Sequence, residues 1–227
     1  MVNGNLTRSI EELQLSVLPA TTKRALLVLS KAQWLKKHGW YLAGGTALAL
    51  QAGHRQSVDL DFFTKKKLFD VEKLETNLKN IGNWVTSSRS IGTLYGKLFN
   101  VKISFIAYPF FRPSTKKLVF GNVVILNPDD IAVMKIIAIS QRGRKRDFID
   151  LYWYLKNSGN FYETLSRMIK QYPQQHNLPH IFKSFIYFDE AEKDPDPRTN
   201  MGVLWNDVKS FFRRETAIVA RQFLQLK

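Results

Sequence analysis

Two aspartates lie two residues apart in a hydrophobic stretch of the chain, in the segment VDLDFF. Asp59 and Asp61 flank Leu60. Because side chains alternate along a β-strand, both carboxylates are expected on one face while Val58, Leu60 and Phe62 point into the core. Burying two like charges side by side is costly unless a cation lies between them. The pair therefore predicts a site for a hard divalent cation, Mg²⁺ or Mn²⁺, with water and phosphate oxygens completing its coordination.

A glycine pair precedes the aspartates, in the sequence Gly44-Gly45-Thr46. The main chain of glycine can approach a phosphate closely, and the N–H groups at the start of a helix favour an anion. Thr46 either adds a hydroxyl to such a phosphate cradle or caps the helix. The order strand, Gly-Gly-Thr, helix and Asp-x-Asp strand predicts a phosphate cradle beside a metal site, and the combination is more specific than either motif alone.

Polar residues also occupy the turn between the two motifs. His54, Arg55 and Ser57 are near enough in sequence to contact a phosphate, although His54 equally fits a residue that packs inside the loop. The lysine run 65–67 after the aspartates is expected to be solvated or to face RNA.

A second basic cluster occurs in the segment SQRGRKRD, which is expected to form a loop leading into a helix. Its cations are Arg142, Arg144, Lys145 and Arg146. They suit a clamp for a triphosphate or an RNA backbone, and an ordinary solvated loop would have the same composition.

Three further charged residues lie on expected helices. Lys135, taken alone, is typical of a helix lysine whose stem covers apolar surface. Asp147 lies at a helix start, where a carboxylate is also favoured as a cap. Asp150 follows one turn later on nearly the same face.

The elements that must position these residues follow from hydrophobic periodicity and turn signals. A surface helix is expected first, and it is followed by the strand, glycine turn, helix and strand that carry the two motifs. More strands and a helix follow, and helical periodicity dominates after Pro128. The expected helices are 21–37, 46–52, 70–81, 129–140, 147–156, 161–171 and 203–224, and the expected strands are 40–43, 58–63, 84–88, 94–100, 101–108, 117–120 and 123–126.

This pattern predicts an α+β fold, with a mixed sheet flanked by helices and a mainly helical C-terminal region. The boundary is placed at residue 127, giving an α/β core over 1–127 and a helical region over 128–227. The absence of cysteine excludes disulfides and thiolate metal sites. With no signal peptide or membrane-spanning apolar run, a soluble cytoplasmic protein is expected. A formal net charge of +15 favours a polyanionic partner such as RNA.

The segment LAGGTALALQAGHRQSVDLDFF resembles the glycine-glycine-serine/threonine and Asp-x-Asp signature of the DNA polymerase beta-like nucleotidyltransferases, with 12 residues between Thr46 and Asp59. More closely, that segment, MKIIAISQRGRKRDFIDLYWYL and YFDEAEKDPDP resemble the AbiEii/AbiGii toxin family. The acidic third segment, taken by itself, favours a capping and turn structure over a second metal site.

The resemblance implies metal-dependent transfer of a nucleoside monophosphate from an NTP to an acceptor, and a separate antitoxin as partner. In better understood relatives the acceptor is the 3′ end of tRNA. It further implies that Asp59 and Asp61 hold the metal, that Lys135 reaches the triphosphate and that Asp147 acts in the site as a base or as an organiser of arginines. The nucleotide-binding residues would be Gly44, Gly45, Thr46, Arg55, Ser57 and Arg146, with Asp150, Arg144 and His54 as less certain members.

One feature departs from the superfamily pattern. A third carboxylate is common on a later strand, but in NVKISFIAY the outward positions are Lys102 and Ser104. Two alternatives to an RNA nucleotidyltransferase toxin follow. One is a catalytically weak NTP- or RNA-binding protein on the same scaffold, which the missing acid favours. The other is a toxin that nucleotidylates protein.

Overall fold

The computed structural model describes residues 13–114, 116–173 and 177–224, and these form two compact units. The first unit contains the described residues up to Gly53 together with 57–109 and 114–127, and the second contains 54–56, 110–113 and the residues from Pro128 onward.

A mixed seven-stranded sheet forms the centre of the first unit, in the order β3-β4-β5-β2-β1-β7-β6. Strand β2 runs antiparallel to β1 and parallel to β5, and β1 runs parallel to β7. The strands are β1 (Tyr41–Ala43), β2 (Leu60–Thr64), β3 (Trp84–Ser90), β4 (Thr93–Leu98), β5 (Val101–Ala107), β6 (Lys117–Phe120) and β7 (Val123–Leu126). The predicted α+β class with a mixed sheet is confirmed.

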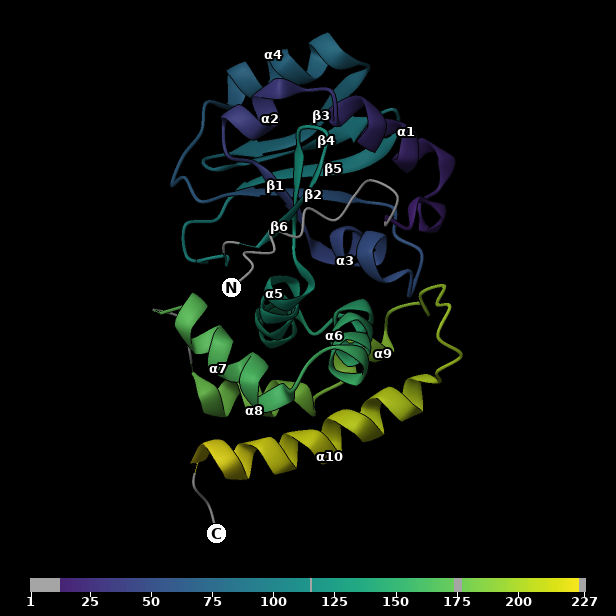
Figure 1. Cartoon of the computed structure of the whole chain (residues 1–227), viewed down its shortest axis with the longest axis vertical. Helices are drawn as coiled ribbons and strands as arrows, with labels where there is room; N and C mark the ends of the chain where they lie inside the picture. The colour runs from purple at the N-terminus through teal and green to yellow at the C-terminus, as the bar shows by residue number, and fades with distance from the viewer. Residues whose placement is uncertain (1–12, 115, 174–176, 225–227) are drawn as a thin grey trace, which may run out of the picture. The chain divides into compact units, whose positions relative to one another are not determined.

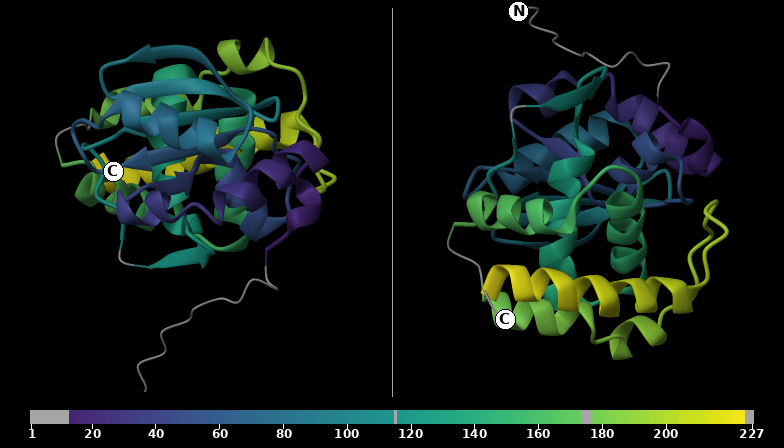
Figure 2. Two further views of the ribbon diagram at one scale, coloured as in Figure 1. Left: turned by 90° about the horizontal axis from the view of Figure 1, so that it is seen from above. Right: turned by 60° about the horizontal axis from the view of Figure 1, so that its bottom comes forward.

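Helices cover both faces of this sheet. Helices α1, α2 and α4 lie on one side and α3 lies on the other (Figures 1 and 2). On the side of α1, α2 and α4, the rings of Phe62 and Phe105 stack with their centroids 5.1 Å apart. The helical elements of the unit are η2 (Leu15–Val17), α1 (Ala20–Leu29), α2 (Gln33–Lys37), α3 (Gly44–Ala52) and α4 (Val71–Ile81).

Two local expectations are wrong. The helix expected over 21–37 is divided into α1 and α2, because the Ser30 carbonyl accepts hydrogen bonds from the main-chain N–H and the side chain of Asn122 instead of continuing the helical ladder. Val58 is 51% exposed rather than in the core, since β2 begins only at Leu60. The buried positions of Leu60 and Phe62 are confirmed.

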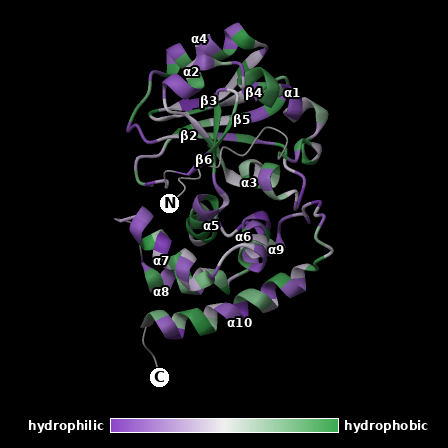
Figure 3. Ribbon diagram, in the orientation of Figure 1, coloured by the Kyte–Doolittle hydropathy of each residue, from purple (hydrophilic) through white to green (hydrophobic). Residues whose placement is uncertain are grey.

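The second unit is helical. Helix α10 packs against α6, α7 and α8, and α5 also contacts all three. Hydrophobic and hydrophilic residues alternate along α10 (Figure 3), which matches a helix with one buried face. An aromatic cluster in the interior includes Phe148, Phe185 and Phe212. The helices are α5 (Pro128–Arg142), α6 (Lys145–Asn157), α7 (Phe161–Gln171), α8 (Leu178–Phe185), α9 (Asp189–Glu192) and α10 (Trp205–Leu224).

The segment SQRGRKRD is not a loop, as only Gly143 and Arg144 separate α5 from α6. Helix α8 is not among the predicted elements. Within the described ranges, no helix combines the length and apolarity that a membrane span requires.

Candidate active site

Gly44 lies against Asp61 at the point where β1 passes into α3. It begins the helix with a φ of +70°, and a Cβ built on it would lie 3.0 Å from Asp61 Oδ2. Ala43, the residue before the helix, provides no side-chain cap. A residue other than glycine would be strained here and would press on the carboxylate, so this turn requires glycine.

Replacing Gly44 by alanine is expected to destabilise the fold by about 1–2 kcal/mol through backbone strain and, through displacement of Asp61, to slow any reaction that uses this carboxylate by at least about tenfold. Gly39 provides a matched control, since its φ is +74° and nothing lies within 4 Å of a Cβ built there. Thermal unfolding and activity are measured for Gly44→Ala and Gly39→Ala. Both variants introduce backbone strain at a positive φ, but only Gly44→Ala also introduces a contact with Asp61. Equal activity in the two variants would contradict a role for the Gly44–Asp61 contact.

Asp61 is held by the neighbouring strand. In the parallel register of β2 and β5 it lies opposite Ser104, whose Oγ donates a hydrogen bond of 2.5 Å to Asp61 Oδ1. Ser104 is buried and Asp61 is half-buried. Ser104 occupies one of the two outward positions of β5 that sequence analysis considered for a third carboxylate. It provides a hydroxyl there, and this hydroxyl orients the Asp61 carboxylate.

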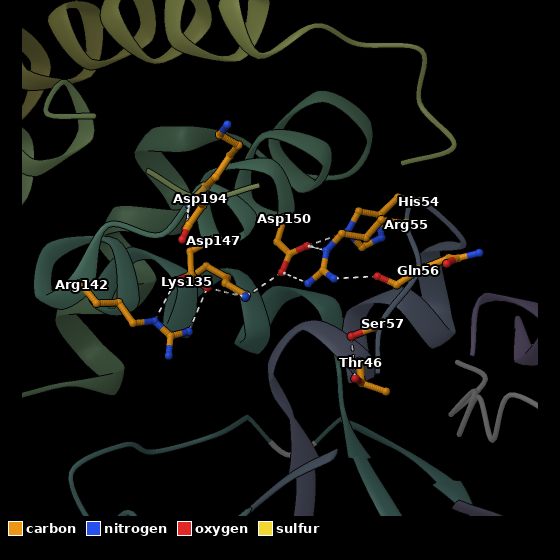
Figure 4. A network of polar contacts seen from close by, with 11 residues as sticks. Thr46, His54, Arg55, Gln56, Ser57, Lys135, Arg142, Asp147, Asp150 and Asp194 are labelled. Atoms are coloured by element: carbon orange, nitrogen blue, oxygen red, sulfur yellow. Dashed lines mark hydrogen bonds and ion pairs between the residues drawn. The ribbon is translucent and has the colours of Figure 1, made fainter. Parts of the chain in front are cut away.

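Thr46 links α3 to the segment before β2. Its buried hydroxyl donates to the main-chain carbonyl of Asp59 and lies 2.7 Å from Ser57 Oγ. Because Thr46 uses its hydrogen on Asp59, Ser57 is the donor in the second bond (Figure 4). Both hydroxyls thus fix the main chain that presents Asp59, and direct binding of phosphate by either one stays a prediction.

The donor set of this unit fits a magnesium-type ion. Asp59 and Asp61 are half-buried, and nowhere in the described ranges do three or more His, Cys, Asp or Glu residues gather as a metal-binding group. Mg²⁺ is commonly bound by one or two carboxylates together with waters and substrate phosphates. Asp61 beside the glycine turn, with Asp59 two residues earlier in the sequence, is compatible with such coordination. Whether both point to one face stays a prediction, since Asp59 precedes the strand.

The second unit contains a buried ionic network around Asp150. Arg55 binds both carboxylate oxygens, with Nε 2.6 Å from Oδ1 and one terminal nitrogen 2.8 Å from Oδ2. His54 Nε2 lies 2.7 Å from Oδ1, and Lys135 Nζ lies 2.6 Å from Oδ2 (Figure 4). Lys135 also binds Asp147 at 2.7 Å. Five of the residues named from the sequence therefore lie in one network: His54, Arg55, Lys135, Asp147 and Asp150.

Arg142, at the end of α5, completes the network by donating to both oxygens of Asp147. Burial by itself would raise the pKa of both aspartates, but their cations outweigh it. Lys135 and Arg142 lower the pKa of Asp147, and Arg55 and Lys135 hold the pKa of Asp150 well below its ordinary value. Both carboxylates are therefore charged at neutral pH.

Three more basic residues stand at the start of α6. Arg144 pairs with Asp194 at 2.9 Å, and Lys145 Nζ is buried and binds Asp196 at 2.9 Å. Asp194 also accepts from the main-chain N–H of Lys145, so the α6 cap comes from the acidic segment rather than from Asp147. Arg146 is exposed. An anion reaching Arg144 would have to compete with Asp194.

Comparisons with known proteins identify the family of this chain. The sequence profile of the family described as "Nucleotidyl transferase AbiEii toxin, Type IV TA system" matches residues 27–218. The chain belongs to the AbiEii nucleotidyltransferase toxin family. It is accordingly a nucleotidyltransferase, a class that generally uses an NTP and a divalent metal ion, and its system includes an antitoxin partner.

Individual proteins are also similar to this chain. An uncharacterized protein of Aquifex aeolicus (strain VF5) is 34% identical over 181 residues, covering 78% of this chain and 85% of the relative. Two solved structures share the fold. A candidate nucleotidyltransferase from H. pylori has a TM-score of 0.53 and 14% identity, covering 92% of this chain and 99% of that one. The nucleotidyltransferase toxin MenT4 from Mycobacterium tuberculosis H37Rv has a TM-score of 0.57 and 15% identity, covering 89% and 86%.

Two supporting residues of this AbiEii-family protein were not among those predicted. Ser104 could have been found from its place at the outward position of NVKISFIAY, once the strand register was known. Asp194 had no local signal, because its partner Lys145 lies 49 residues away in the sequence.

Proposed function

We propose that this protein transfers a nucleoside monophosphate from an NTP to an RNA hydroxyl, at a metal site formed by Asp59 and Asp61. The observation that carries the proposal is the approach of the Gly44 turn to Asp61, whose other oxygen accepts from Ser104. This arrangement places a carboxylate next to the start of a helix, where the main chain favours an anion. A turn suited to binding phosphate and a carboxylate suited to binding a metal ion therefore lie side by side.

The chain's own residues would contribute in distinct ways. Main-chain N–H groups of the Gly44-Gly45 turn would bind phosphate oxygens of the NTP, and Asp59 and Asp61 would hold the divalent ion. When bound, that ion would neutralise charge that develops on the phosphates. In the transfer the acceptor oxygen bonds to the α-phosphorus and its hydroxyl proton passes to solvent water, while the bond from the α-phosphorus to the oxygen shared with the β-phosphate breaks and pyrophosphate leaves.

The roles assigned to Lys135, Asp147, Asp150 and the arginines stay predictions. Lys135 is 4% exposed, and its ammonium forms ion pairs with two aspartates. A direct contact with phosphate would therefore have to replace one of these ion pairs. Its proposed contribution is the positive charge it provides to its surroundings, with Asp147 and Asp150 fixing its position.

RNA is the favoured acceptor because the chain has a formal net charge of +15, and a polyanion is attracted to such a surface. The proposal extends to the 3′ end of tRNA. The acceptor is identified by incubating the protein with Mg²⁺, an α-labelled NTP, cellular RNA and cellular protein, and then digesting the product with ribonuclease or with protease.

Label that ribonuclease releases, in a band of tRNA size, is the expected result. Label that only protease releases would identify the protein-nucleotidylating alternative. Binding of NTP without any transfer would support the alternative of a binding protein, which the hydroxyl of Ser104 in place of a third carboxylate keeps open.

A further inference from the structure

A cavity of about 340 Å³ opens in the first unit, between α2, the start of β1, the loop after β2, and α4. Trp40 lines it, and the Trp40 ring makes an edge contact with Phe105 at 5.0 Å. Phe105 points away from the face of its neighbour Ser104, because side chains alternate along β5. The cavity therefore lies on the opposite face of the sheet from Asp61, and the proposed transfer chemistry does not use it.

Aromatic side chains form one part of the cavity wall. Trp34 is half-buried on α2, Trp40 is buried, and Phe69 packs edge-on against Trp40 with ring centroids 5.0 Å apart. Such a wall offers flat apolar surface to a planar ring, and base–aromatic stacking is a common way to bind nucleotides. The volume is within the range of small-molecule sites.

Cations form another part of the wall. Lys66 and Lys73 line the cavity with exposed side chains, and His38 lies between α2 and β1. The pKa of His38 is lowered, mainly by its partial burial and to a smaller extent by repulsion from Lys66, Lys73 and Lys37. Although burial is the largest cause of the shift, the contributions of the three lysines indicate a positive charge near His38 that favours an anion.

The carboxylate that lines the cavity is already engaged. Asp70 precedes α4, and its Oδ1 accepts a 2.9 Å hydrogen bond from the main-chain N–H of Lys73. It caps the helix, so it leaves the side-chain ammonium groups of Lys66 and Lys73 available for a ligand.

We infer that this cavity is a second binding site, and that its ligand is a nucleoside phosphate. The base would lie against Trp34 and Phe69, and the phosphate would lie between Lys66 and Lys73. A free nucleotide and one nucleotide of an RNA strand offer the same chemistry, and the test separates these two sources.

The test measures binding to the full chain in EDTA, so that metal-dependent binding at Asp59 and Asp61 is suppressed. The probes are AMP, GMP, CMP and UMP, a six-nucleotide single-stranded RNA, and inorganic phosphate. Titration calorimetry gives the affinity, and a change in tryptophan emission is a second signal, since Trp34 and Trp40 are two of the five tryptophans in the chain. The double variant Lys66→Ala/Lys73→Ala is compared with Lys79→Ala/Lys97→Ala, which removes two exposed lysines that do not line the cavity.

Saturable binding with a change in tryptophan emission is expected, at least about tenfold weaker in Lys66→Ala/Lys73→Ala and within about twofold of wild type in the control pair. Binding of a mononucleotide would identify a free nucleotide as ligand, and saturable binding of the RNA alone would identify a strand. Three results would overturn the inference. They are equal weakening of nucleotide binding in the two double variants, binding of inorganic phosphate as tight as that of nucleotides, and the absence of saturable binding.

Discussion

Replacing Asp61 by asparagine is expected to lower the rate of nucleotide transfer by about 10³-fold or more while the fold stays intact. The variant removes the negative charge that would hold the divalent ion, and such an ion contributes several kcal/mol of charge stabilisation. An asparagine amide oxygen can still accept the hydrogen bond that Ser104 donates. Asp59→Asn is expected to give a similar loss.

The initial rate of nucleotide transfer is measured, and the thermal unfolding of the same samples shows whether the fold is intact. Asp207→Asn is a matched control, because Asp207 is exposed and accepts the 3.2 Å bond from the main-chain N–H of Leu204, a capping role that asparagine also fills. The control should transfer at the wild-type rate. Transfer by Asp61→Asn within a few-fold of wild type would contradict the metal assignment.

Replacing Asp150 by asparagine is expected to destabilise the protein by about 3–5 kcal/mol, the usual cost of breaking a buried ion pair. Asp150 is fully buried, and its loss would leave Arg55 and Lys135 without the charge that both contact. Arg144→Ala breaks the more exposed pair with Asp194 and should cost no more than about 1 kcal/mol. Denaturant unfolding of both variants checks this, and a loss of no more than about 1 kcal/mol in Asp150→Asn would show that the Asp150 network does not stabilise the fold.

The same residue predicts a pH dependence. The folded-state pKa of Asp150 lies well below its ordinary value of 3.8, so its stabilising contribution is complete above that value. The contribution is lost as the pH falls from there through the folded-state pKa. Wild type should therefore lose stability more steeply below about pH 4 than Asp150→Asn does. Parallel stability curves for the two proteins in acid would exclude this role.

The sheet and the turn at Gly44 could be predicted from sequence because their signals are local. Alternation marks Leu60 and Phe62 as buried, and a glycine pair between a strand and a helix marks a turn. The split at Ser30 could not be predicted, since its carbonyl is bound by Asn122, which lies 92 residues away.

The network around Asp150 shows the same limit. The sequence spacing places Asp147 and Asp150 one helical turn apart. No local signal indicates that Arg55, 95 residues earlier, binds Asp150. The segment 54–56 belongs to the helical unit although both of its neighbours in sequence belong to the sheet unit. Pairings of this kind arise from tertiary packing, which periodicity does not record.

The central claim is that this AbiEii-family protein transfers a nucleoside monophosphate with a metal ion held at Asp59 and Asp61. The most direct test is transfer of label from α-labelled NTP into total RNA by wild type with Mg²⁺, by wild type with EDTA, and by Asp59→Asn/Asp61→Asn with Mg²⁺. Labelled RNA in the first sample alone is the predicted result. Equal labelling by the double variant would contradict the claim.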